Sequence, residues 1–396
     1  MLFAATERAV YVSFDDGDHW QSLQLNLPHT SMRDLWTHEN DLIVATHGRG
    51  FWILDDIAPL REASAALANS VHLFSPAPAY RVQRDTNTDT PLPPEEPAAA
   101  NPPDGAIFDY YLPSAASTVA LEILDGKGDV VRRFASTDKP DLTEEELQKQ
   151  LIPLYWVRKP RQLSTSVGMH RWTWGLHYAA PTATRHEYPI AAIPHDTPRF
   201  PLGPTVLPGS YTVRLTVDGK SSTALLTVKM DPRVKTPSLG LQKKFKAETQ
   251  LASILSETSQ AFLQGGSIRE QIEKVSGDVS SATKDTLQAL EKKLTALLGA
   301  SGGFFASPSA EVTLGRVNGE ASALYGQVWQ ADAEPTAPQL EALALTEHDS
   351  ADVLKRWNDF KVSELPALNR QLREAKAPEI QLESNIQREE PQVDEE

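Results

Sequence analysis

Short runs in which apolar and polar residues alternate occupy much of the chain up to residue 235, and they predict β-strands. In SYTVRLTV, for example, Tyr211, Val213 and Leu215 alternate with threonine and arginine, as a strand with one buried face requires. Similar runs are AIFDYYL, TVALEIL, HRWTWGL and ALLTVKM, with turns such as DGKGD and VDGK in the same region. The pattern predicts a β-sandwich over residues 106–235, with insertions at 135–167 and 177–207.

After residue 235 the spacing of apolar residues changes to three and four, which is typical of helices. Leucines recur at this spacing over residues 287–297, and Gly299 follows them at the position where a helix ends. Comparable apolar stripes lie before and after this segment, and Pro366 is expected to bend the last helix. The sequence therefore predicts a helical bundle over residues 236–376.

Two further stretches are predicted to lie outside packed domains. Residues 61–105 hold one helix candidate and one strand candidate, followed by TPLPPEEPAAANPPDG, which predicts a proline-rich linker. Four residues match positions of a calcium loop, but the loop lacks its glycine and its flanking helices, so no calcium site is assigned. These four are Asp85, Asn87, Asp89 and Glu96. Residues 377–396 end in QREEPQVDEE and are predicted to form an acidic, disordered tail.

The first sixty residues contain an internal repeat. LFAATERAVYVSFDD (2–16) aligns without a gap on LIVATHGRGFWILDD (42–56), at an offset of 40 residues. Each copy reads as a hairpin, and WQSLQL and MRDLWTH between the copies are two more strand candidates. Four short strands in a period of this length are typical of a propeller blade. Because a propeller needs roughly four to eight blades, residues 1–60 predict a partial propeller with exposed strand edges unless the chain oligomerises.

A motif of the form Ser-x-Asp-x-Gly-x-x-Trp lies in the first copy of the repeat. Its defining residues are Ser13, Asp15, Gly17 and Trp20. It resembles the Asp-box of bacterial neuraminidase repeats (BNR repeats), found in propellers of sialidases, sortilin-like receptors and many secreted glycosidase-like proteins. The resemblance implies a structural role, in which the aspartate accepts backbone N–H groups across a turn. The glycine permits positive φ, and the tryptophan packs between strands of the blade.

The second copy of the repeat has lost this motif. It keeps Asp55 and Asp56 but has Ile57 and Leu60 where glycine and tryptophan would fall, as in the last blade of a propeller. The two aspartates are candidates for a paired acid and base. Their alignment with the aspartates of the first copy favours turn residues instead.

THGRGFWILDDI resembles the closing blade of large bacterial proteins described as glycosyl hydrolases or as sortilin-like repeat proteins. In these proteins a β-sandwich and a helical segment follow the propeller. The segments YYLPSAASTVALEILDGKGDVVRRF, GMHRWTWGL and LPGSYTVRLTV are similar to the immunoglobulin-like repeat of flagellar hook-capping proteins. The resemblance covers residues 1–235 and implies a secreted, periplasmic or cell-envelope location.

Few other residues suggest chemistry. His47 and Arg49 lie in a glycine-containing turn that could line a ligand face of a propeller, but the sequence favours a solvated turn that the glycines shape. His170, His177, His186 and His195 lack the spacing of zinc ligands. Trp172 and Trp174 share one strand face and are expected in the core rather than on a sugar platform. No motif assigns a catalytic residue, a cofactor or a metal.

Composition narrows the classes of partner. A net charge of −15 disfavours nucleic acid, and no apolar run is long enough to span a bilayer. The absence of cysteine excludes disulfides, thiolate metal sites and a cysteine nucleophile. MLFAATERAV has no signal-peptide pattern, so the chain is either cytoplasmic or lacks its true start.

The sequence as a whole predicts a multidomain β plus α protein: a partial β-propeller, an immunoglobulin-like sandwich and a C-terminal helical bundle. The function we expect is scaffolding and protein or glycan binding by a non-catalytic C-terminal portion of a larger propeller protein. Its first partner would be the missing upstream blades of the same protein. One alternative is a fragment of a sialidase-like glycoside hydrolase whose catalytic residues lie in those blades. Another is an adaptor in secretion or assembly.

Overall fold

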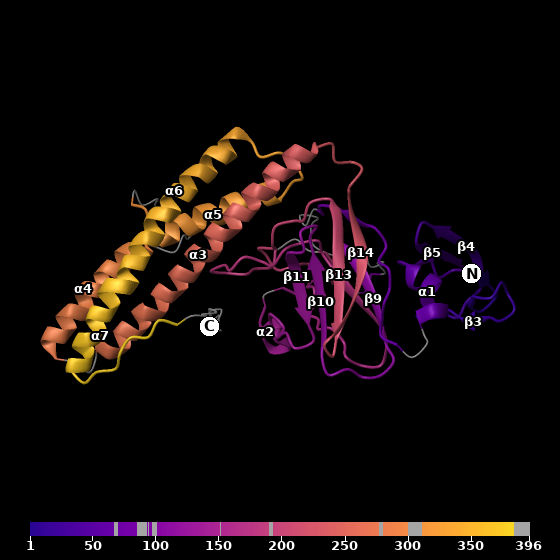
Figure 1. Cartoon of the computed structure of the whole chain (residues 1–396), viewed down its shortest axis with the longest axis horizontal. Helices are drawn as coiled ribbons and strands as arrows, with labels where there is room; N and C mark the ends of the chain where they lie inside the picture. Colours follow the sequence, from indigo (N-terminus) through magenta and orange to yellow (C-terminus); the bar gives the residue numbers. More distant parts are fainter. Residues whose placement is uncertain are drawn as a thin grey trace. The chain divides into compact units, whose positions relative to one another are not determined.

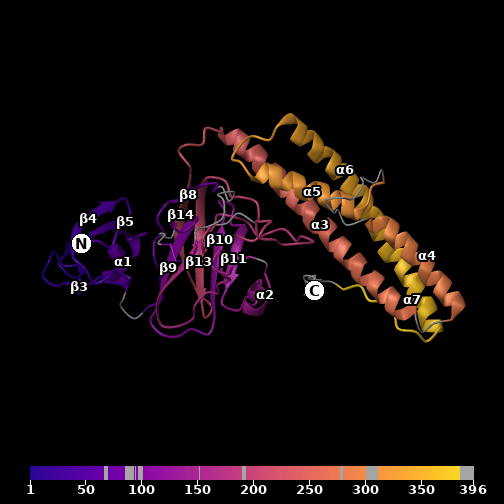
Figure 2. The same cartoon turned by 180° about the vertical axis from the view of Figure 1, so that it is seen from behind.

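The computed structural model describes residues 1–66, 70–84, 93, 95–96, 101–150, 152–189, 193–276, 280–299 and 311–383. They form two compact units. The first holds Met1–His177, Ile190–Thr197 and Leu207–Val234, and the second holds Tyr178–Pro189, Pro198–Val206 and Lys235–Glu396. Figures 1 and 2 show strands in the first unit and long helices in the second, so the predicted mixture of β and α structure is confirmed.

The internal repeat folds into two antiparallel sheets of three strands. The first sheet is β1 (Leu2–Ala5), β2 (Val10–Ser13) and β3 (Gln21–Ser22), and the second is β4 (Met32–His38), β5 (Asp41–Thr46) and β6 (Phe51–Leu54). Both predicted hairpins and both predicted intervening strands are present. The two sheets bury one shared core, which includes Val10, Val12, Leu42 and Val44. Helix α1 (Ala58–Ala66) follows.

Two further sheets of the first unit take up the region predicted as a sandwich. Their strands are β7 (His72–Leu73), β8 (Ala79–Arg81), β9 (Ala106–Leu112), β10 (Val119–Leu124), β11 (Val130–Ala135), β12 (Gly168–Trp174), β13 (Gly209–Val217) and β14 (Lys220–Met230). One sheet has the order β11-β10-β13-β14-β8 and the other β12-β9-β7. The rings of Trp174 on β12 and Tyr211 on β13 lie 6.2 Å apart and join the two sheets. Trp172 and Trp174 are buried, as predicted. The short helix α2 (Glu144–Gln148) lies between β11 and β12.

The predicted linker at 61–105 is wrong in its extent: the strand candidate VHLF within it forms β7, as predicted, and β8 is a further strand that was not predicted. Strand β7 pairs with β9, and β8 pairs in parallel with β14. Phe74 and Arg81 are buried as well. The packed β region therefore begins near residue 72 rather than at residue 106, because these short segments supply edge strands that their own sequence only weakly indicates. The calcium-loop residues Asp85, Asn87 and Asp89 lie outside the described residues.

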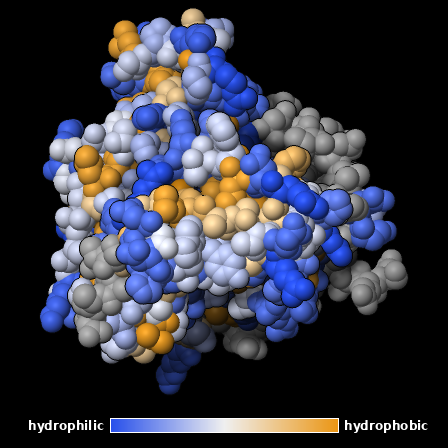
Figure 3. All heavy atoms as spheres, turned by 90° about the vertical axis from the view of Figure 1, so that its right-hand side faces the viewer, coloured by the Kyte–Doolittle hydropathy of each residue, from blue (hydrophilic) through white to orange (hydrophobic). Residues whose placement is uncertain are grey.

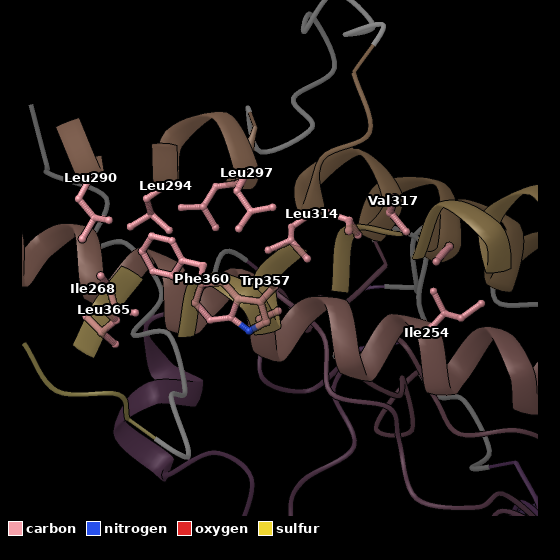
Figure 4. Close-up of a cluster of buried hydrophobic side chains, with 14 of the residues drawn as sticks. Ile254, Ile268, Leu290, Leu294, Leu297, Leu314, Val317, Trp357, Phe360 and Leu365 are labelled. Atoms are coloured by element: carbon pink, nitrogen blue, oxygen red, sulfur yellow. The ribbon is translucent and has the colours of Figure 1, made fainter. Parts of the chain in front are cut away.

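The second unit is built from helices around one hydrophobic core. They are α3 (Ser238–Ser276), α4 (Ser281–Leu298), α5 (Leu314–Trp329), α6 (Ala337–Asp359), the π-helical turn η1 (Phe360–Glu364) and α7 (Leu365–Glu374). Figure 4 shows leucines of α4 pointing toward Phe360 and Trp357, whose rings are stacked with centroids 5.6 Å apart. Gly299 ends α4 with φ 68°, as predicted.

The predicted bend at Pro366 takes the form of a π-helical turn. Helices α6 and α7 run on through η1 without a break, so one helical segment spans residues 337–374. Proline has no N–H, and its ring collides with the carbonyl four residues earlier in a regular helix. A local widening of the helix immediately before Pro366 relieves that collision.

The boundaries of the helical unit differ from the prediction at two places. Parts of the predicted insertion 177–207 group with the helices: Thr182 N–H donates to Ser256 Oγ at 3.1 Å, and Tyr325 Oη donates to the Leu202 carbonyl at 2.7 Å. Residues 377–383, predicted as the start of the tail, instead pack on the helices through the buried side chain of Ile380. The remainder of the predicted tail lies outside the described residues.

Candidate functional site

The motif that resembles an Asp-box forms a closed turn after β2. Ser13 Oγ accepts the Gly17 N–H at 2.8 Å and donates to Asp15 Oδ1 at 2.9 Å, and Asp15 Oδ1 also accepts the His19 N–H at 2.9 Å. Gly17 has φ 103°, which favours glycine. The structural roles expected for the aspartate and the glycine are confirmed. The role expected for Trp20 is not, because its side chain is 43% exposed beside Gly17 rather than packed between strands.

The hydrogen bonds of this turn favour the ionised form of Asp15. The backbone N–H of His19, then its side chain and the Ser13 hydroxyl, lower the pKa of Asp15 to about 2. A lowered pKa means that the folded state releases this proton more readily than the unfolded state. The stabilisation is therefore complete above the ordinary pKa of 3.8 and is lost as the pH falls toward 2.

We expect Asp15→Asn to flatten the acid limb of the stability curve between about pH 4 and pH 2. The measurement is urea unfolding of both proteins across this range, followed by tryptophan fluorescence. Asp18→Asn, in the same loop, is the control and should leave the acid limb in place. An Asp15→Asn protein with an unchanged acid limb would contradict the assignment of Asp15 as the residue that closes the turn.

Of the two aspartates of the second copy, Asp56 anchors the backbone between β6 and α1. Asp56 has φ 55°, matching φ 57° at its repeat counterpart Asp16. Its Oδ1 accepts the Ala58 N–H at 3.0 Å, and its own N–H donates to Asp41 Oδ1 at 3.0 Å. Burial raises the pKa of Asp56, and burial followed by the charge of Asp41 raises that of Asp55.

An arginine that the sequence analysis missed links this turn to the sheet β12-β9-β7. Arg171 Nη1 donates to the Asp55 carbonyl at 2.7 Å and Nη2 to the Asp56 carbonyl at 3.1 Å. The same guanidinium binds both carboxylate oxygens of Asp109, which is only 6% exposed. Nothing in the run HRWTWGL marks this arginine, because alternation predicts a polar side chain there whether or not it is paired.

The remaining candidates for chemistry are His47, Arg49 and possible metal ligands. His47 and Arg49 are exposed in the turn between β5 and β6, where Gly48 has φ 69° and Gly50 φ 77°. Trp52 Nε1 donates to the Arg49 carbonyl at 3.0 Å, so a side chain of β6 holds the backbone of this turn in place. A ligand-binding role for His47 and Arg49 stays a prediction. Within the described ranges, no three His, Cys, Asp or Glu side chains are grouped closely enough to hold a metal ion. No helix among the described residues has the length and apolarity of a membrane span.

The most distinctive surface of the repeat is apolar. Trp36 on β4 lies opposite Ile43 on β5, which lies opposite Ile53 on β6, and Ala45 lies opposite Phe51. Cross-strand partners share one side of a sheet, so these five residues form one surface, named here the outer face. Trp36 is 67% exposed, Phe51 78% and Ile53 56%. Figure 3 views the N-terminal sheets from the right-hand side of Figure 1 and shows hydrophobic residues gathered among polar ones.

The outer face is unusual for an antiparallel sheet with one solvated side. Such a sheet normally alternates hydrophobic residues toward the core with polar residues toward water. Here Val44 and Trp52 face the core while Ile43 and Ile53 face outward. The signal was available in the sequence, because FWIL at 51–54 is apolar at every position instead of alternating.

A hollow of about 310 Å³ lies between β1 and β4. Its lining is mostly apolar: Met1, Leu2, Phe3, Leu35, Trp36, Thr37 and Leu42. A water molecule occupies about 30 Å³ in the liquid, so the hollow has room for several side-chain groups.

Comparisons with known proteins add little to this geometry. No family model matches the chain, and no curated protein does. Among solved structures, the crystal structure of CopC from Methylosinus trichosporium OB3b shows 11% sequence identity, with a TM-score of 0.17. That similarity covers 42% of this chain and 99% of the other. At this TM-score it carries no argument about fold or function.

Proposed function

We propose that this chain is the non-catalytic C-terminal portion of a larger, secreted or cell-envelope propeller protein. Its role is scaffolding, together with protein or glycan binding. In this proposal the two N-terminal sheets are terminal blades, the β region beyond them is an immunoglobulin-like domain, and the upstream blades of the same protein are the first partner.

The observation that carries the proposal is the way the two sheets of the repeat bury their faces. In the first sheet the core contains Phe3 and Ala5, whereas in the second it contains Leu42 and Val44. At the repeat offset of 40, Leu42 and Val44 correspond to residues 2 and 4. The first strands, β1 and β5, therefore bury alternate positions of the repeat, whereas the second strands, β2 and β6, bury the same position, Val12 and Trp52. Both sheets pack on one shared core, as neighbouring blades of a propeller do.

The outer face extends the same argument. Its Ile43 and Ala45 are the repeat counterparts of Phe3 and Ala5, which are covered in the first sheet. A further sheet stacked in the same sense would cover the outer face in the same way. An apolar surface of this kind marks an interaction site on a soluble protein.

Reading the DNA upstream of the Met1 codon tests this proposal. We expect further copies of the repeat at a spacing near 40 residues, preceded by a signal peptide. A stop codon and a ribosome-binding site directly before Met1 would contradict it.

An enzyme assay tests the non-catalytic part of the proposal separately. The purified chain, incubated with neutral and sialylated glycoside substrates, is expected to release no product above a buffer control. Turnover that survives repurification would contradict the assignment.

A further inference from the structure

Strand β1 has a free edge whose hydrogen-bonding groups can be identified from the ladder. The Val10 carbonyl accepts the Leu23 N–H at 2.8 Å, so Val10 faces β3 rather than β1. Thr6 N–H donates to the Ala9 carbonyl at 3.0 Å across the turn. Antiparallel pairs alternate, so the even-numbered residues of β1 bond to β2. The backbone N–H and C=O groups of Phe3 and Ala5 point away from β2, at the edge of the sheet.

The second copy of the repeat shows what occupies the corresponding edge. Strand β5 is the counterpart of β1, and β6 is the counterpart of β2. Strand β5 pairs with β6 along one edge and with β4 along the other. The pairing with β4 is antiparallel and extends over the whole of β4, from Met32 to His38. In the described residues β1 pairs with β2 alone. The first copy thus lacks the strand that the second copy has.

The hollow lies beside this edge. It is bounded by Met1, Leu2 and Phe3 on one side and by residues of β4 and β5 on the other. A strand added to β1 would direct alternate side chains into the hollow, toward the partly exposed Leu35 and the exposed Trp36.

We propose that the edge of β1 binds one further strand, antiparallel to β1 and of the same kind as β4, from another copy of this repeat in the same protein. Main-chain hydrogen bonds to Phe3 and Ala5 provide the pairing, and apolar side chains of the added strand fill the hollow. The source of the strand rests on the proposed function, whereas the edge and the hollow do not.

The test uses the full chain and a synthetic peptide with the sequence SMRDLWTHE, residues 31–39. Amide hydrogen exchange at Phe3 and Ala5 is expected to slow on addition of the peptide, while the amides of Ile43 and Ala45 stay unchanged. A change at Ile43 and Ala45 instead would mean that the peptide replaces the chain's own β4 and would count against the proposal.

Two variants sharpen the test. Ala5→Pro removes an edge N–H while leaving the bonds to β2, and proline is tolerated on edge strands. It is expected to weaken peptide binding about tenfold, the size of one lost hydrogen bond. A peptide carrying Leu35→Pro and Thr37→Pro should not bind. Equal binding of this peptide, or no protection at Phe3 and Ala5 at millimolar peptide, overturns the proposal. Upstream DNA without repeats would overturn the proposed function but not this pairing.

Discussion

A chain with Lys244→Met is expected to lose about 3–5 kcal/mol of unfolding free energy, the usual effect of removing one partner of a buried ion pair. Lys244 and Glu248 are both fully buried on α3, and Nζ lies 2.5 Å from Glu248 Oε1. Asp332 Oδ1 lies 3.7 Å from the same nitrogen. Without the ammonium group, two carboxylates would remain in the core of the helical unit.

The surroundings of this cluster are consistent with a buried negative charge. Burial, followed by the charge of Glu248, raises the pKa of Tyr325. The Tyr325 hydroxyl remains protonated and donates to the Leu202 carbonyl. Lys244 therefore places a positive charge next to both of these buried carboxylates.

Chemical unfolding followed by far-ultraviolet circular dichroism measures the effect, since most helix lies in this unit. Lys243→Met is the matched control, because Lys243 pairs with Glu334 at the surface and such pairs contribute about 0–1 kcal/mol. Adding Glu248→Leu to Lys244→Met should restore part of the loss, since it removes one stranded charge. If the Lys244 and Lys243 variants unfold alike, the buried cluster is refuted.

Periodicity and repeats predicted much of the fold because they depend on local sequence. Leucine spacing located α4, and the alignment of the two copies anticipated that Asp55 and Asp56 are turn residues. The φ values of 57° at Asp16 and 55° at Asp56 agree with this prediction for the second aspartate of each pair. Such features need only neighbours along the chain to form.

The features that sequence reasoning missed depend on distant residues. Lys243 and Lys244 are adjacent and chemically identical, and only the packing of other elements on one face of α3 buries Lys244 and leaves Lys243 exposed. Likewise, β8 becomes a strand because β14 offers it an edge. The outer face could be predicted from FWIL, which is apolar at every position. The hollow, in contrast, depends on how β1 and β4 approach each other.

Arg171→Met is expected to destabilise the first unit by about 2–3 kcal/mol at neutral pH. The value lies below that for a fully buried pair because the Arg171 side chain is 33% exposed. Burial alone would lower the pKa of Arg171, but hydrogen bonds to Asp109 and its charge outweigh burial and raise it. Removing the guanidinium leaves the buried Asp109 carboxylate without its bidentate partner.

The same substitution has a predictable pH dependence. The pKa values of Asp55 and Asp56 are raised by burial, while the charge of Arg171 opposes the shift. Without Arg171 these pKa values rise further, so the folded state binds more protons than the unfolded state just above about pH 4. Stability of the variant therefore falls as the pH rises through this window, and the difference from the unmodified chain shrinks at about pH 3.

Urea unfolding at several pH values, followed by tryptophan fluorescence, separates this effect from a general loss of charge. Arg133→Met is the matched control, because its pair with Asp138 is half-exposed at 3.6 Å and should contribute less than about 1 kcal/mol. Arg171→Lys keeps the positive charge but cannot form the paired hydrogen bonds of a guanidinium, so it should recover only part of the stability. Faster hydrogen exchange in residues 41–57 of the methionine variant would show that Arg171 joins the repeat to β9 and β12. Equal, pH-independent losses in Arg171→Met and Arg133→Met would show that it does not.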